Sequence, residues 1–439
     1  MSVPSQRPRH DRTQPPTVSG VSGSASRCGP ACAASRLWVV GGARGTPGCD
    51  GVAGLRLGLV LEQCLAPVPG GTGRYTHELA AAVAAAAGPD DRVSGWCAWH
   101  RDVAAATIPG VVGPRRLPLP RRLLAEAWRL GSGPGLREPD VVHAPTLLVP
   151  PVRGGQRLVV TIHDAVPWTH PATLTPRGVR WHRRMAERAI AAADAVVVPT
   201  EAVAAELVRY LHPRPGQMHV IGEGVADSVR SVPPDAARRA RRLALPDGGY
   251  LLTLATLEPR KGLDVALAAL ARPEAPGLPL LVAGRPGWGG VDLPSQAARL
   301  GLSAGRVRLL GHLHDADLAV VLARATALLM PSRSEGFGLP VVEALAHGVP
   351  AVVTDVPALV EVGGGAGSAA VLVVAVDDAA ALASAAAEIV AEAADPGRRA
   401  RRAQACRAAV EHRSWASVAA TCWRLYRSLT GSAAVSRVR

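Results

Sequence analysis

The stretch that decides the fold is PSRSEGFGLPVVEALA, residues 331–346. It follows the short apolar run Ala327–Met330, which predicts a buried strand, and its second half has the composition of a helix with Pro340 in the first turn. A strand, a glycine-containing loop and a helix in this order are typical of a parallel sheet covered by helices. Ligands bind at the carboxyl ends of the strands in such sheets, so we expect the chemistry in this loop.

Two carboxylates of this stretch, Glu335 in the loop and Glu343 in the helix, are separated by seven residues. The only phenylalanine of the chain, Phe337, stands between Gly336 and Gly338, where its ring can wall a pocket. Two carboxylates that flank a sugar also suit glycoside hydrolysis, so this pair alone does not choose the reaction.

Short apolar runs alternate with helical segments on both sides of this stretch, in two series. The first series predicts strands at 55–61, 141–143, 158–162, 195–198 and 219–221, and helices at 76–87, 178–193 and 200–210. The second series predicts strands at 250–254, 279–282, 307–310, 327–330, 351–353 and 371–374, and helices near 262–271, 294–301, 315–324, 340–347 and 378–394. Strands and helices that alternate in this way predict the α/β class, with two doubly wound, Rossmann-like domains that face a central cleft.

The composition of the chain suggests where the domains begin and end. Residues 1–54 are rich in Pro, Ser, Gly and Arg and show no period, which predicts a disordered tail. Residues 55–228 form the N-terminal domain, and the Pro- and Arg-rich residues 229–248 form a linker. We assign residues 249–410 to the C-terminal domain and 411–439 to a C-terminal helix with a basic tail.

Two further motifs lie between a predicted strand and a helix. The segment PGGTGRY, residues 69–75, lets the backbone approach a ligand closely and offers a helix N-terminus to a phosphate, although a tight turn explains it equally well. In Thr161–Asp164, His163 can bind a sugar hydroxyl or a phosphate, and the alternative is a histidine satisfied at a strand end.

The pair Arg260-Lys261 is the third motif outside the central stretch. Two adjacent cations before a helix oppose the helix dipole, which favours a bound phosphate over a solvated basic turn. The chain has 48 Arg and no Lys apart from Lys261. Because an ammonium is a compact point charge and a guanidinium a planar fork, a surviving Lys points to a position that Arg cannot fill.

The net charge of +14 lies mainly at the two ends of the chain. Residues 1–54 carry +4 and residues 395–439 carry +8, which leaves only +2 for the 340 residues between them. With so few aromatic residues, this distribution argues against a nucleic-acid groove. Seven cysteines without a C-x-x-C pair argue against a disulfide scaffold or a zinc site, and they favour the cytoplasm.

Together, the central stretch 331–346 and the motifs at 69–75, 161–164 and 260–262 resemble those of the retaining glycosyltransferases of family 4, which have the two-domain GT-B fold. The resemblance rests on Glu335 and Glu343 within S-E-G-F-G-L-P-x-x-E-A-L-A-x-G-x-P, on Arg260-Lys261-Gly262, on Gly70–Tyr75 and on His163-Asp164. It covers about residues 55–430, and it implies transfer of a sugar, with mannose as the weakest part of the analogy, from a nucleotide-diphosphate donor.

The resemblance also implies roles for residues of the C-terminal domain. Glu335 corresponds to the carboxylate beside the transferred sugar, and Glu343 to the acceptor of hydrogen bonds from the donor ribose. Arg260 and Lys261 correspond to the pair that neutralises the diphosphate. Fixed cations of this kind can replace a divalent ion, so the resemblance implies no metal and no cofactor apart from the nucleotide sugar as substrate.

Other residues are assigned by the same resemblance. Gly71 and Gly73 are expected to bind the phosphates through their backbone, His163 to lie near the sugar, and Gly336, Phe337 and Gly338 to line the donor site. Relatives often carry Asn-Gly after the last strand of the N-terminal domain, whereas this chain has Gly222-Glu223-Gly224. A sugar-nucleotide epimerase of the same architecture and a non-catalytic partner that binds sugar nucleotides are the alternative interpretations.

The acceptor is expected to be a glycan or a lipid-linked molecule. The segment 114–130 mixes Arg with Leu and Trp, and from about Arg121 its apolar residues can share one helical face. Such a segment can lie on an anionic bilayer, or it is an ordinary helix that covers the core. We therefore expect a cytoplasmic enzyme with a peripheral contact at the inner face of the plasma membrane.

Overall fold

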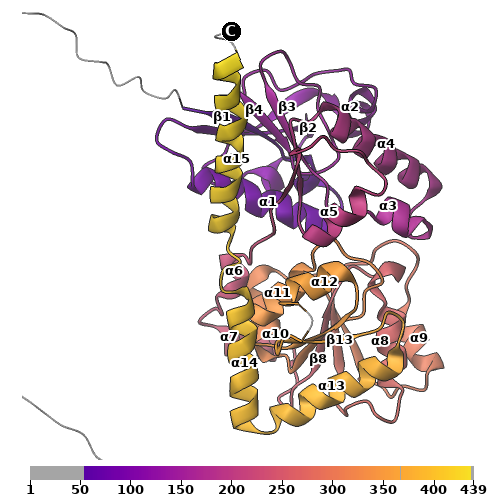
Figure 1. Cartoon of the computed structure of the whole chain (residues 1–439). Coiled ribbons are helices and arrows are strands. Elements are labelled where there is room, and N and C mark those ends of the chain that lie inside the picture. The colour runs from indigo at the N-terminus through magenta and orange to yellow at the C-terminus, as the bar shows by residue number, and fades with distance from the viewer. Residues whose placement is uncertain (1–53, 366, 437–439) are drawn as a thin grey trace, which may run out of the picture. The chain divides into compact units, whose positions relative to one another are not determined.

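The computed structural model describes residues 54–365 and 367–436. These residues form two parallel sheets with helices on both faces of each, which confirms the predicted fold class (Figure 1). The tail predicted for residues 1–54 lies outside the described residues, except for Gly54.

The N-terminal sheet has seven strands in the order β3-β2-β1-β4-β5-β6-β7, and all pairs are parallel. Its strands are β1 (Arg56–Val60), β2 (Arg92–Trp99), β3 (Val112–Pro120), β4 (Val141–Ala144), β5 (Arg157–Thr161), β6 (Ala195–Val198) and β7 (Met218–Val220). The helices of this half are α1 (Gly70–Ala85), α2 (Arg121–Arg129), α3 (Val166–Thr169), α4 (Pro176–Ala192) and α5 (Glu201–Leu207).

The C-terminal sheet has six parallel strands in the order β10-β9-β8-β11-β12-β13. They are β8 (Leu251–Leu254), β9 (Leu280–Ala283), β10 (Val307–Gly311), β11 (Ala327–Met330), β12 (Ala351–Thr354) and β13 (Val371–Val374). The helices that follow β7 are α6 (Asp227–Arg230), α7 (Ala236–Arg242), α8 (Leu263–Leu270), α9 (Leu293–Arg299), α10 (Asp315–Arg324), α11 (Leu339–Ala346), α12 (Pro357–Val362), α13 (Ala379–Ala393), α14 (Pro396–Val410) and α15 (Trp415–Ser436).

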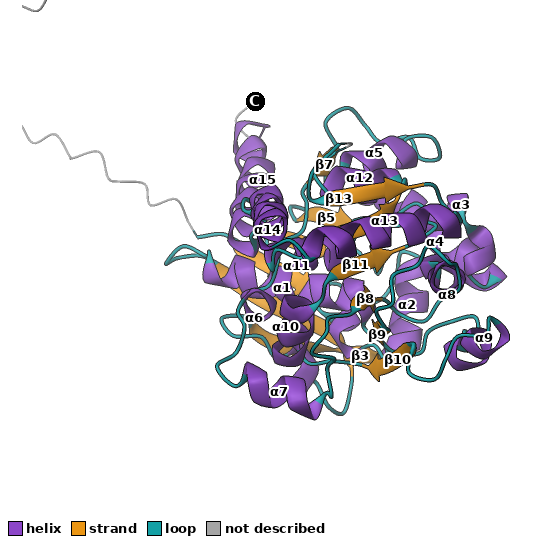
Figure 2. Ribbon diagram, turned by 90° about the horizontal axis from the view of Figure 1, so that it is seen from below, coloured by secondary structure: helices purple, strands orange, loops and turns teal. Residues whose placement is uncertain are grey.

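The four inner strands of the C-terminal sheet, β9, β8, β11 and β12, bury both faces, so they read as continuous apolar runs. Leu251 and Leu329 pack with α8 and α13, whereas their neighbours Leu252 and Leu328 pack with α10 and α11 on the other face. Figure 2 shows this sheet from below, with helices on either side of it. The alternation of side chains within each strand therefore explains why almost every residue of these strands is apolar.

The local structure differs from the sequence expectations in several places. The glycine-rich segment 69–75 is not a loop, because α1 already begins at Gly70. The sequence missed β2 and β3, and residues 114–120 belong to β3. β3 is an edge strand, where prolines are tolerated because one side of the strand needs no partner. The segment 229–248 is not only a linker, since it contains α7, which packs against α10.

The chain crosses between the two halves twice, at neighbouring positions. The first crossing follows β7, and the second lies between α14 and α15, after which α15 packs on α1 of the N-terminal half (Figure 1). Val225 N donates to Arg413 O at 3.3 Å, and Val225 and Ser414 form a parallel bridge. The helix near the C-terminus thus completes the N-terminal half, and the paired crossings mark the hinge between the halves.

A buried chain of polar side chains ties α15 to the N-terminal sheet. The Tyr426 hydroxyl lies 2.7 Å from Nδ1 of His143, whose Nε2 lies 2.9 Å from the Thr161 hydroxyl. Thr161 in turn lies 3.2 Å from the Tyr75 hydroxyl on α1. Burial lowers the pKa of His143 to about 3, so its ring is neutral and donates from only one nitrogen.

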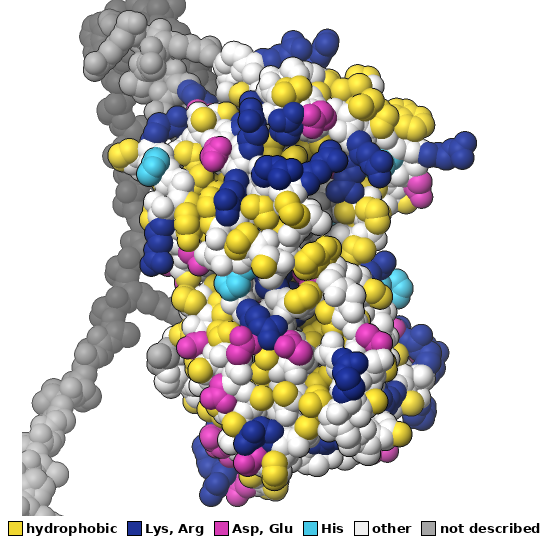
Figure 3. Space-filling model, turned by 90° about the vertical axis from the view of Figure 1, so that its right-hand side faces the viewer, with side chains coloured by type: hydrophobic (Ala, Val, Ile, Leu, Met, Phe, Trp, Pro, Cys, Tyr) yellow, Lys and Arg dark blue, Asp and Glu magenta, His cyan; other side chains and the backbone are white. Residues whose placement is uncertain are grey.

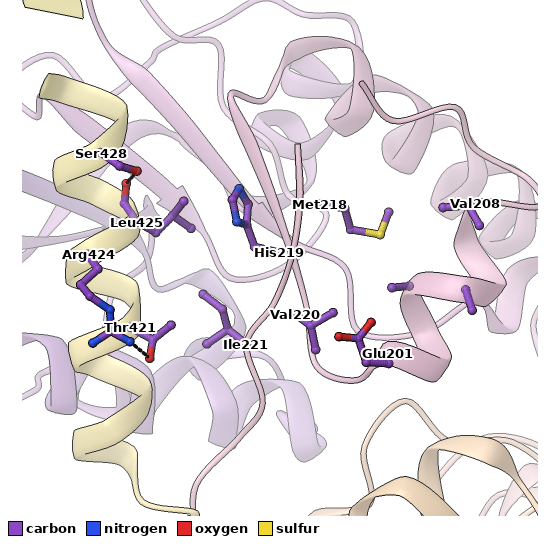
Figure 4. A pocket seen from close by; sticks show the side chains of 12 residues that line it. Glu201, Val208, Met218, His219, Val220, Ile221, Thr421, Arg424, Leu425 and Ser428 are labelled. Carbon is purple, nitrogen blue, oxygen red and sulfur yellow. Dashed lines mark hydrogen bonds between the residues drawn. The ribbon is translucent and has the colours of Figure 1, made fainter. Parts of the chain in front are cut away.

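The edge strand β7 lies in an open groove between α5 and α15. Figure 4 shows its residues Met218–Val220 between Glu201 and Val208 on α5 and Thr421 and Arg424 on α15. The groove has a volume of about 840 Å³ and lies apart from the ends of the strands where we expect a ligand. Among the helices of residues 54–365 and 367–436, none is long and apolar enough to cross a bilayer.

We predict that Tyr426→Phe destabilises the fold by ~1–3 kcal/mol, because it removes the partner of a fully buried histidine nitrogen. Thermal unfolding of the purified protein measures this. Tyr210→Phe is the matched control, since Tyr210 is 41% exposed, and its melting temperature should stay within a degree or two of wild type. Equal melting temperatures for both variants would contradict the role of the buried chain.

Candidate functional site

A cleft of about 730 Å³ lies between the two halves, at the carboxyl ends of both sheets. All ten residues that the sequence predicted for the site line it. They are Gly71, Gly73, His163, Arg260, Lys261, Glu335, Gly336, Phe337, Gly338 and Glu343. The fold thus brings four separate segments to one place, and their side chains differ in what they can do there.

Glu335 is the centre of the strongest polar cluster in the cleft. Its Oε1 accepts from Lys261 Nζ at 2.6 Å and from the Ser332 hydroxyl at 2.8 Å, and its Oε2 lies 3.3 Å from Arg260 Nη1. Burial alone would raise the pKa of Glu335, but Lys261 and Arg260 lower it to about 2. Glu335 is therefore ionised at every physiological pH.

The two cations do not stand without a counter-ion, as the sequence suggested. They belong to a short 3₁₀ turn, Pro259–Lys261, and α8 begins only after Gly262. Glu335 pairs with both Arg260 and Lys261, and Glu258 Oε2 lies 3.9 Å from Arg260 Nη2, so two carboxylates balance the two cations at this point. The conflict with the helix dipole is therefore weaker evidence for a phosphate than the sequence indicated.

Glu343 lies on α11, buried to 3% exposure, and has a very different environment. Its nearest cation is Arg74 on α1, with Arg74 Nε 3.4 Å from Glu343 Oε1. Burial raises the pKa of Glu343 to about 7, because Arg74 only partly offsets it and Asp315 and Glu223 add to it. The pKa of Glu335 therefore lies below the ordinary value of a glutamate, and the pKa of Glu343 lies above it.

Arg74 also joins the two halves across the cleft. Its Nη2 lies 3.1 Å from Asp315 Oδ1 on α10, and the Ser228 hydroxyl donates to the other oxygen of Asp315. Asp315 and Asp317 form an Asp-x-Asp triplet that the sequence analysis overlooked. Asp317 forms ion pairs with Arg239 and Arg242, so each carboxylate of the triplet is paired with at least one arginine.

His163 lies at the end of the cleft nearest the hinge. Its Nε2 lies 2.8 Å from the carbonyl oxygen of Pro145, which can only accept, so Nε2 carries the proton. Nδ1 faces Glu223 Oε1 at 3.8 Å. Burial lowers the pKa of His163, but Glu223, the Pro145 carbonyl and Asp164 together more than offset this, so the pKa is raised overall. The edge of Tyr75 packs against the ring and fixes its orientation.

The two glycines at the start of α1 have different roles. A methyl group at Gly71 would meet nothing within 4 Å, so the cleft reaches its backbone. At Gly73 the methyl group would lie 2.3 Å from Pro69 Cβ, and the amide of Gly73 already donates to Pro69 O. The N-terminal amides of α1 that precede Gly73 can therefore bind an anion, whereas Gly73 is needed for packing.

The loop around Glu335 is pressed against the N-terminal half. A methyl group at Gly336 would lie 1.9 Å from the carbonyl oxygen of His163, so only glycine fits, and the Thr200 hydroxyl donates to Gly336 O at 3.0 Å. The Phe337 ring is only 5% exposed and lies under the guanidinium of Arg413 at the hinge. The ring therefore packs behind the wall of the cleft and exposes little of its own surface.

Sequence reasoning missed several residues that line the cleft. Arg285 and His312 follow β9 and β10, and the rule that ligands bind at the carboxyl ends of strands could have found them. Arg74 stands in a motif that was recognised, but its partners on α10 and α11 come from the other half of the chain. No local signal in the sequence could have paired them.

Two family models match the chain, one in each half. Residues 69–229 match "Glycosyltransferase Family 4", and residues 248–392 match "Glycosyl transferases group 1". The first match ends, and the second begins, within the segment that connects β7 to β8.

Two curated relatives cover much of the chain. The O-antigen chain mannosyltransferase B of Escherichia coli is 29% identical over 260 residues, which are 58% of this chain and 66% of the relative. The glycogen synthase of Mycobacterium tuberculosis is 30% identical over 328 residues, which are 67% of this chain and 76% of the relative. The chain thus spans about two thirds to three quarters of the length of these two relatives.

A solved structure has the same fold. The Anabaena protein HepE, in complex with UDP and glucose, superposes with a TM-score of 0.64 at 19% identity. The match covers 85% of this chain and all of the HepE chain. The fold of the described residues is therefore similar to that of HepE.

We predict that Glu343→Gln stabilises the protein at pH 8 but not at pH 5. The folded-state pKa of about 7 lies above the ordinary value of 4.5, so folding favours the protonated form. Ionised Glu343 therefore costs the folded state about 3 kcal/mol above pH 7, and this cost disappears below pH 4.5. Melting temperatures at the two pH values, with exposed Glu388→Gln as control, measure the difference. A variant no more stable than wild type at pH 8 would contradict the assigned environment.

Proposed function

The chain belongs to glycosyltransferase family 4, and on that premise we propose that it transfers mannose, with retention and without a metal ion, from a nucleoside diphosphate to a glycan or lipid-linked acceptor. The observation that carries this proposal is the convergence of Lys261, Arg260, Glu335 and Glu343 in one cleft with the N-terminus of α1 opposite them. The family accounts for the class of reaction, and this cleft supports the roles below.

The cationic part of the cleft is suited to the diphosphate. The glycosidic bond to the diphosphate breaks during transfer, and the leaving nucleotide gains negative charge on its phosphate oxygens. Lys261 and Arg260 stand on one side of this position, and the free amides at Gly70 and Gly71 lie on the other. Charges that are fixed before the reaction stabilise the leaving group without reorganisation.

The two carboxylates of the central motif suit different parts of the donor. Glu335, ionised and held by Lys261, can accept hydrogen bonds from the hydroxyls of the transferred sugar. Glu343 is buried on α11, 3.4 Å from Arg74, and can accept from the ribose hydroxyls. Ribose donors would replace part of the stabilisation that Arg74 gives to Glu343 in this structure.

The absence of a metal requirement is part of the proposal. The Asp-x-Asp triplet is the one pattern in the sequence that suggests a metal-bound diphosphate, and arginines neutralise both of its carboxylates. The cations Lys261 and Arg260 supply the charge that a divalent ion would otherwise provide. Turnover in excess EDTA should equal turnover in Mg²⁺.

Mannose and an O-antigen-like acceptor are supported by one relative, the E. coli mannosyltransferase. The mycobacterial relative, named glycogen synthase, supports glucose as the competing sugar. HepE was crystallised with UDP and glucose. Thermal-shift and nucleotide-release assays with GDP-mannose, UDP-glucose and ADP-glucose test the choice. A larger response to either glucose donor would overturn mannose and leave the glycosyltransferase class intact.

We predict that Lys261→Met lowers turnover by about 100-fold or more, since removal of one fixed donor of charge to a transition state costs ~2.7–4 kcal/mol. Lys261→Arg should recover little, because its planar fork cannot occupy the same contact with Glu335 at 2.6 Å. Nucleotide release from the preferred donor gives the rates. The control removes a cation outside the cleft: exposed Arg272→Met should leave the rate unchanged. Wild-type turnover in Lys261→Met would contradict the role of Lys261.

We also place the enzyme in the cytoplasm, in contact with an anionic membrane. The four described cysteines are free thiols, which suits a reducing compartment. Leu123 on α2 and Leu130 directly after it are 59% and 62% exposed, and basic and hydrophobic side chains gather over this half of the molecule in Figure 3. The part of the predicted segment before Arg121 contributes less, because Arg115 pairs with Glu138.

The membrane contact therefore involves α2 together with α4 rather than the segment 114–130 alone. Exposed arginines of α4 lie on the same side of the sheet as α2, and both helices pack on one cluster of core residues. We name this surface the basic face. It consists of Arg122, Leu123, Leu130, Arg177, Arg180 and Arg184. Each arginine near an anionic surface contributes about 1 kcal/mol.

We predict that changing Arg122, Arg177, Arg180 and Arg184 to Gln abolishes most co-sedimentation with phosphatidylglycerol vesicles. The control changes four exposed arginines of the other half, Arg238, Arg241, Arg272 and Arg299, and removes the same charge. Phosphatidylcholine vesicles should pellet none of the three proteins. If wild type and both variants pellet equally, the basic face is not the membrane contact.

A further inference from the structure

Glu223 is a buried carboxylate in the cleft for which the roles above have no use. It is 6% exposed and lines the same cavity as His163 and Glu343. Within residues 54–365 and 367–436, no hydrogen bond to its carboxylate is present, and its nearest cationic partner is His163 Nδ1 at 3.8 Å. That distance is too long for a hydrogen bond. Glu223 therefore has acceptor capacity that the protein itself leaves unfilled.

The turn that carries Glu223 is held rigidly at the hinge. At Gly224 a methyl group would lie 2.4 Å from the amide nitrogen of Trp415, so no other residue fits. At Gly222 it would touch the Phe337 ring and Arg413. The adjacent Val225 is bonded to Arg413. The carboxylate is thus presented to the cleft by a fixed backbone, and its position is not the result of a flexible loop.

A structural role does not explain this residue. No hydrogen bond of the described residues holds its carboxylate, and its charge raises the pKa of the neighbouring Glu343 and of Tyr75. Its effect on His163 is to favour the protonated ring, although the two groups do not touch. A group that destabilises its surroundings in this way is typical of a binding site, where a ligand supplies the missing partner.

The chemistry of the missing partner follows from the charges around it. An ionised carboxylate accepts and does not donate, so the partner carries a hydroxyl or an ammonium hydrogen. The cations that suit a phosphate, Lys261 and Arg260, pair with Glu335, a different carboxylate of the cleft. A phosphate against Glu223 would instead meet negative charge. His163 Nδ1 and Glu223 Oε1 lie 3.8 Å apart, and the raised pKa of His163 favours the protonated ring, in which Nδ1 also donates. A hydroxyl at this gap can accept from Nδ1 and donate to Glu223.

We propose that Glu223 and His163 together bind one hydroxyl of the transferred sugar, and that Glu223 thereby selects donors that carry this hydroxyl. The inference rests on the proposed use of a nucleotide sugar and adds a residue that recognises the sugar part of it. A donor that lacks the hydroxyl leaves the buried carboxylate unpaired, which a polar site penalises strongly. In this proposal the nucleotide part makes no contact with Glu223, so the affinity for bare nucleoside diphosphate does not depend on the charge of Glu223.

The test compares the affinities of a sugar nucleotide and its bare nucleoside diphosphate, by calorimetry on the full chain. The probes are GDP with GDP-mannose and UDP with UDP-glucose, and the pair with the larger sugar contribution in wild type is used. Glu223→Gln and Glu223→Leu should reduce the ratio of the two affinities about tenfold or more, without changing the affinity for the bare diphosphate. Glu187→Gln, an exposed glutamate of α4, is the matched control and should keep the wild-type ratio.

Melting temperatures separate a binding role from a structural one. Glu223→Gln should melt at or above the wild-type temperature, because the change removes a buried charge that has no hydrogen-bonded partner. A lower melting temperature with an unchanged affinity ratio would assign Glu223 to the fold and overturn the proposal.

The remaining outcomes are also decisive. An unchanged affinity ratio in both Glu223 variants, with slower transfer to acceptor, would move Glu223 to the acceptor and overturn its assignment to the donor sugar. A wild-type protein that binds both bare diphosphates and neither sugar nucleotide any more tightly would also overturn it. If wild type binds no nucleotide at all, the proposed function fails first, and the stability of Glu223→Gln still shows whether the carboxylate is structural.

Discussion

The ion pair between Lys261 and Glu335 depends on the order of strands in the C-terminal sheet. Lys261 follows β8 and Glu335 follows β11, and these strands are far apart in sequence but adjacent in the sheet. Their following loops therefore leave the same edge side by side. The amide of Arg333 donates to Arg260 O at 2.8 Å, and its guanidinium binds Asp264 at the start of α8. The pair is thus a consequence of parallel topology, and the backbone around it is fixed before any ligand binds.

The environment of each carboxylate, more than its identity, decides what it can do. Glu335 lies between two cations and has a pKa of about 2, whereas Glu343 has one arginine, 3.4 Å away, and a pKa of about 7. Glu223 has only a histidine, 3.8 Å away. Three chemically identical groups within one cleft therefore offer a permanent charge, a titratable group and an unfilled acceptor. This division is what a site needs if it binds different parts of one polar ligand.

The sequence predicted the parts of the fold in which local pattern and tertiary environment agree. β11, β13 and α10 begin and end where the pattern placed them, because each is a continuous apolar or amphipathic segment in a buried layer. β3 was missed because prolines in an edge strand hide its pattern. In the site, the motif residues were predictable because each follows a strand of the sheet. The contacts of Arg74 were not predictable, because Asp315 and Glu343 belong to the opposite half of the molecule. The unfilled state of Glu223 was not predictable either, because it depends on the distance to His163 in the folded chain.

The contacts between the halves are of two kinds, and the difference bears on how the cleft can open. At the hinge side, Gly336 lies directly on the His163 backbone, and the carboxylate of Glu361 on α12 accepts from the first two amides of α5. These contacts involve backbone and leave no room for a ligand. Arg74, by contrast, reaches across the cleft with a long side chain to Asp315 and Glu343. In the proposed donor site, a ribose bound to Glu343 would replace one contact of Arg74 and leave the contacts at the hinge in place. Because the guanidinium can keep Asp315 while it releases Glu343, this exchange of partners does not by itself require the two halves to separate.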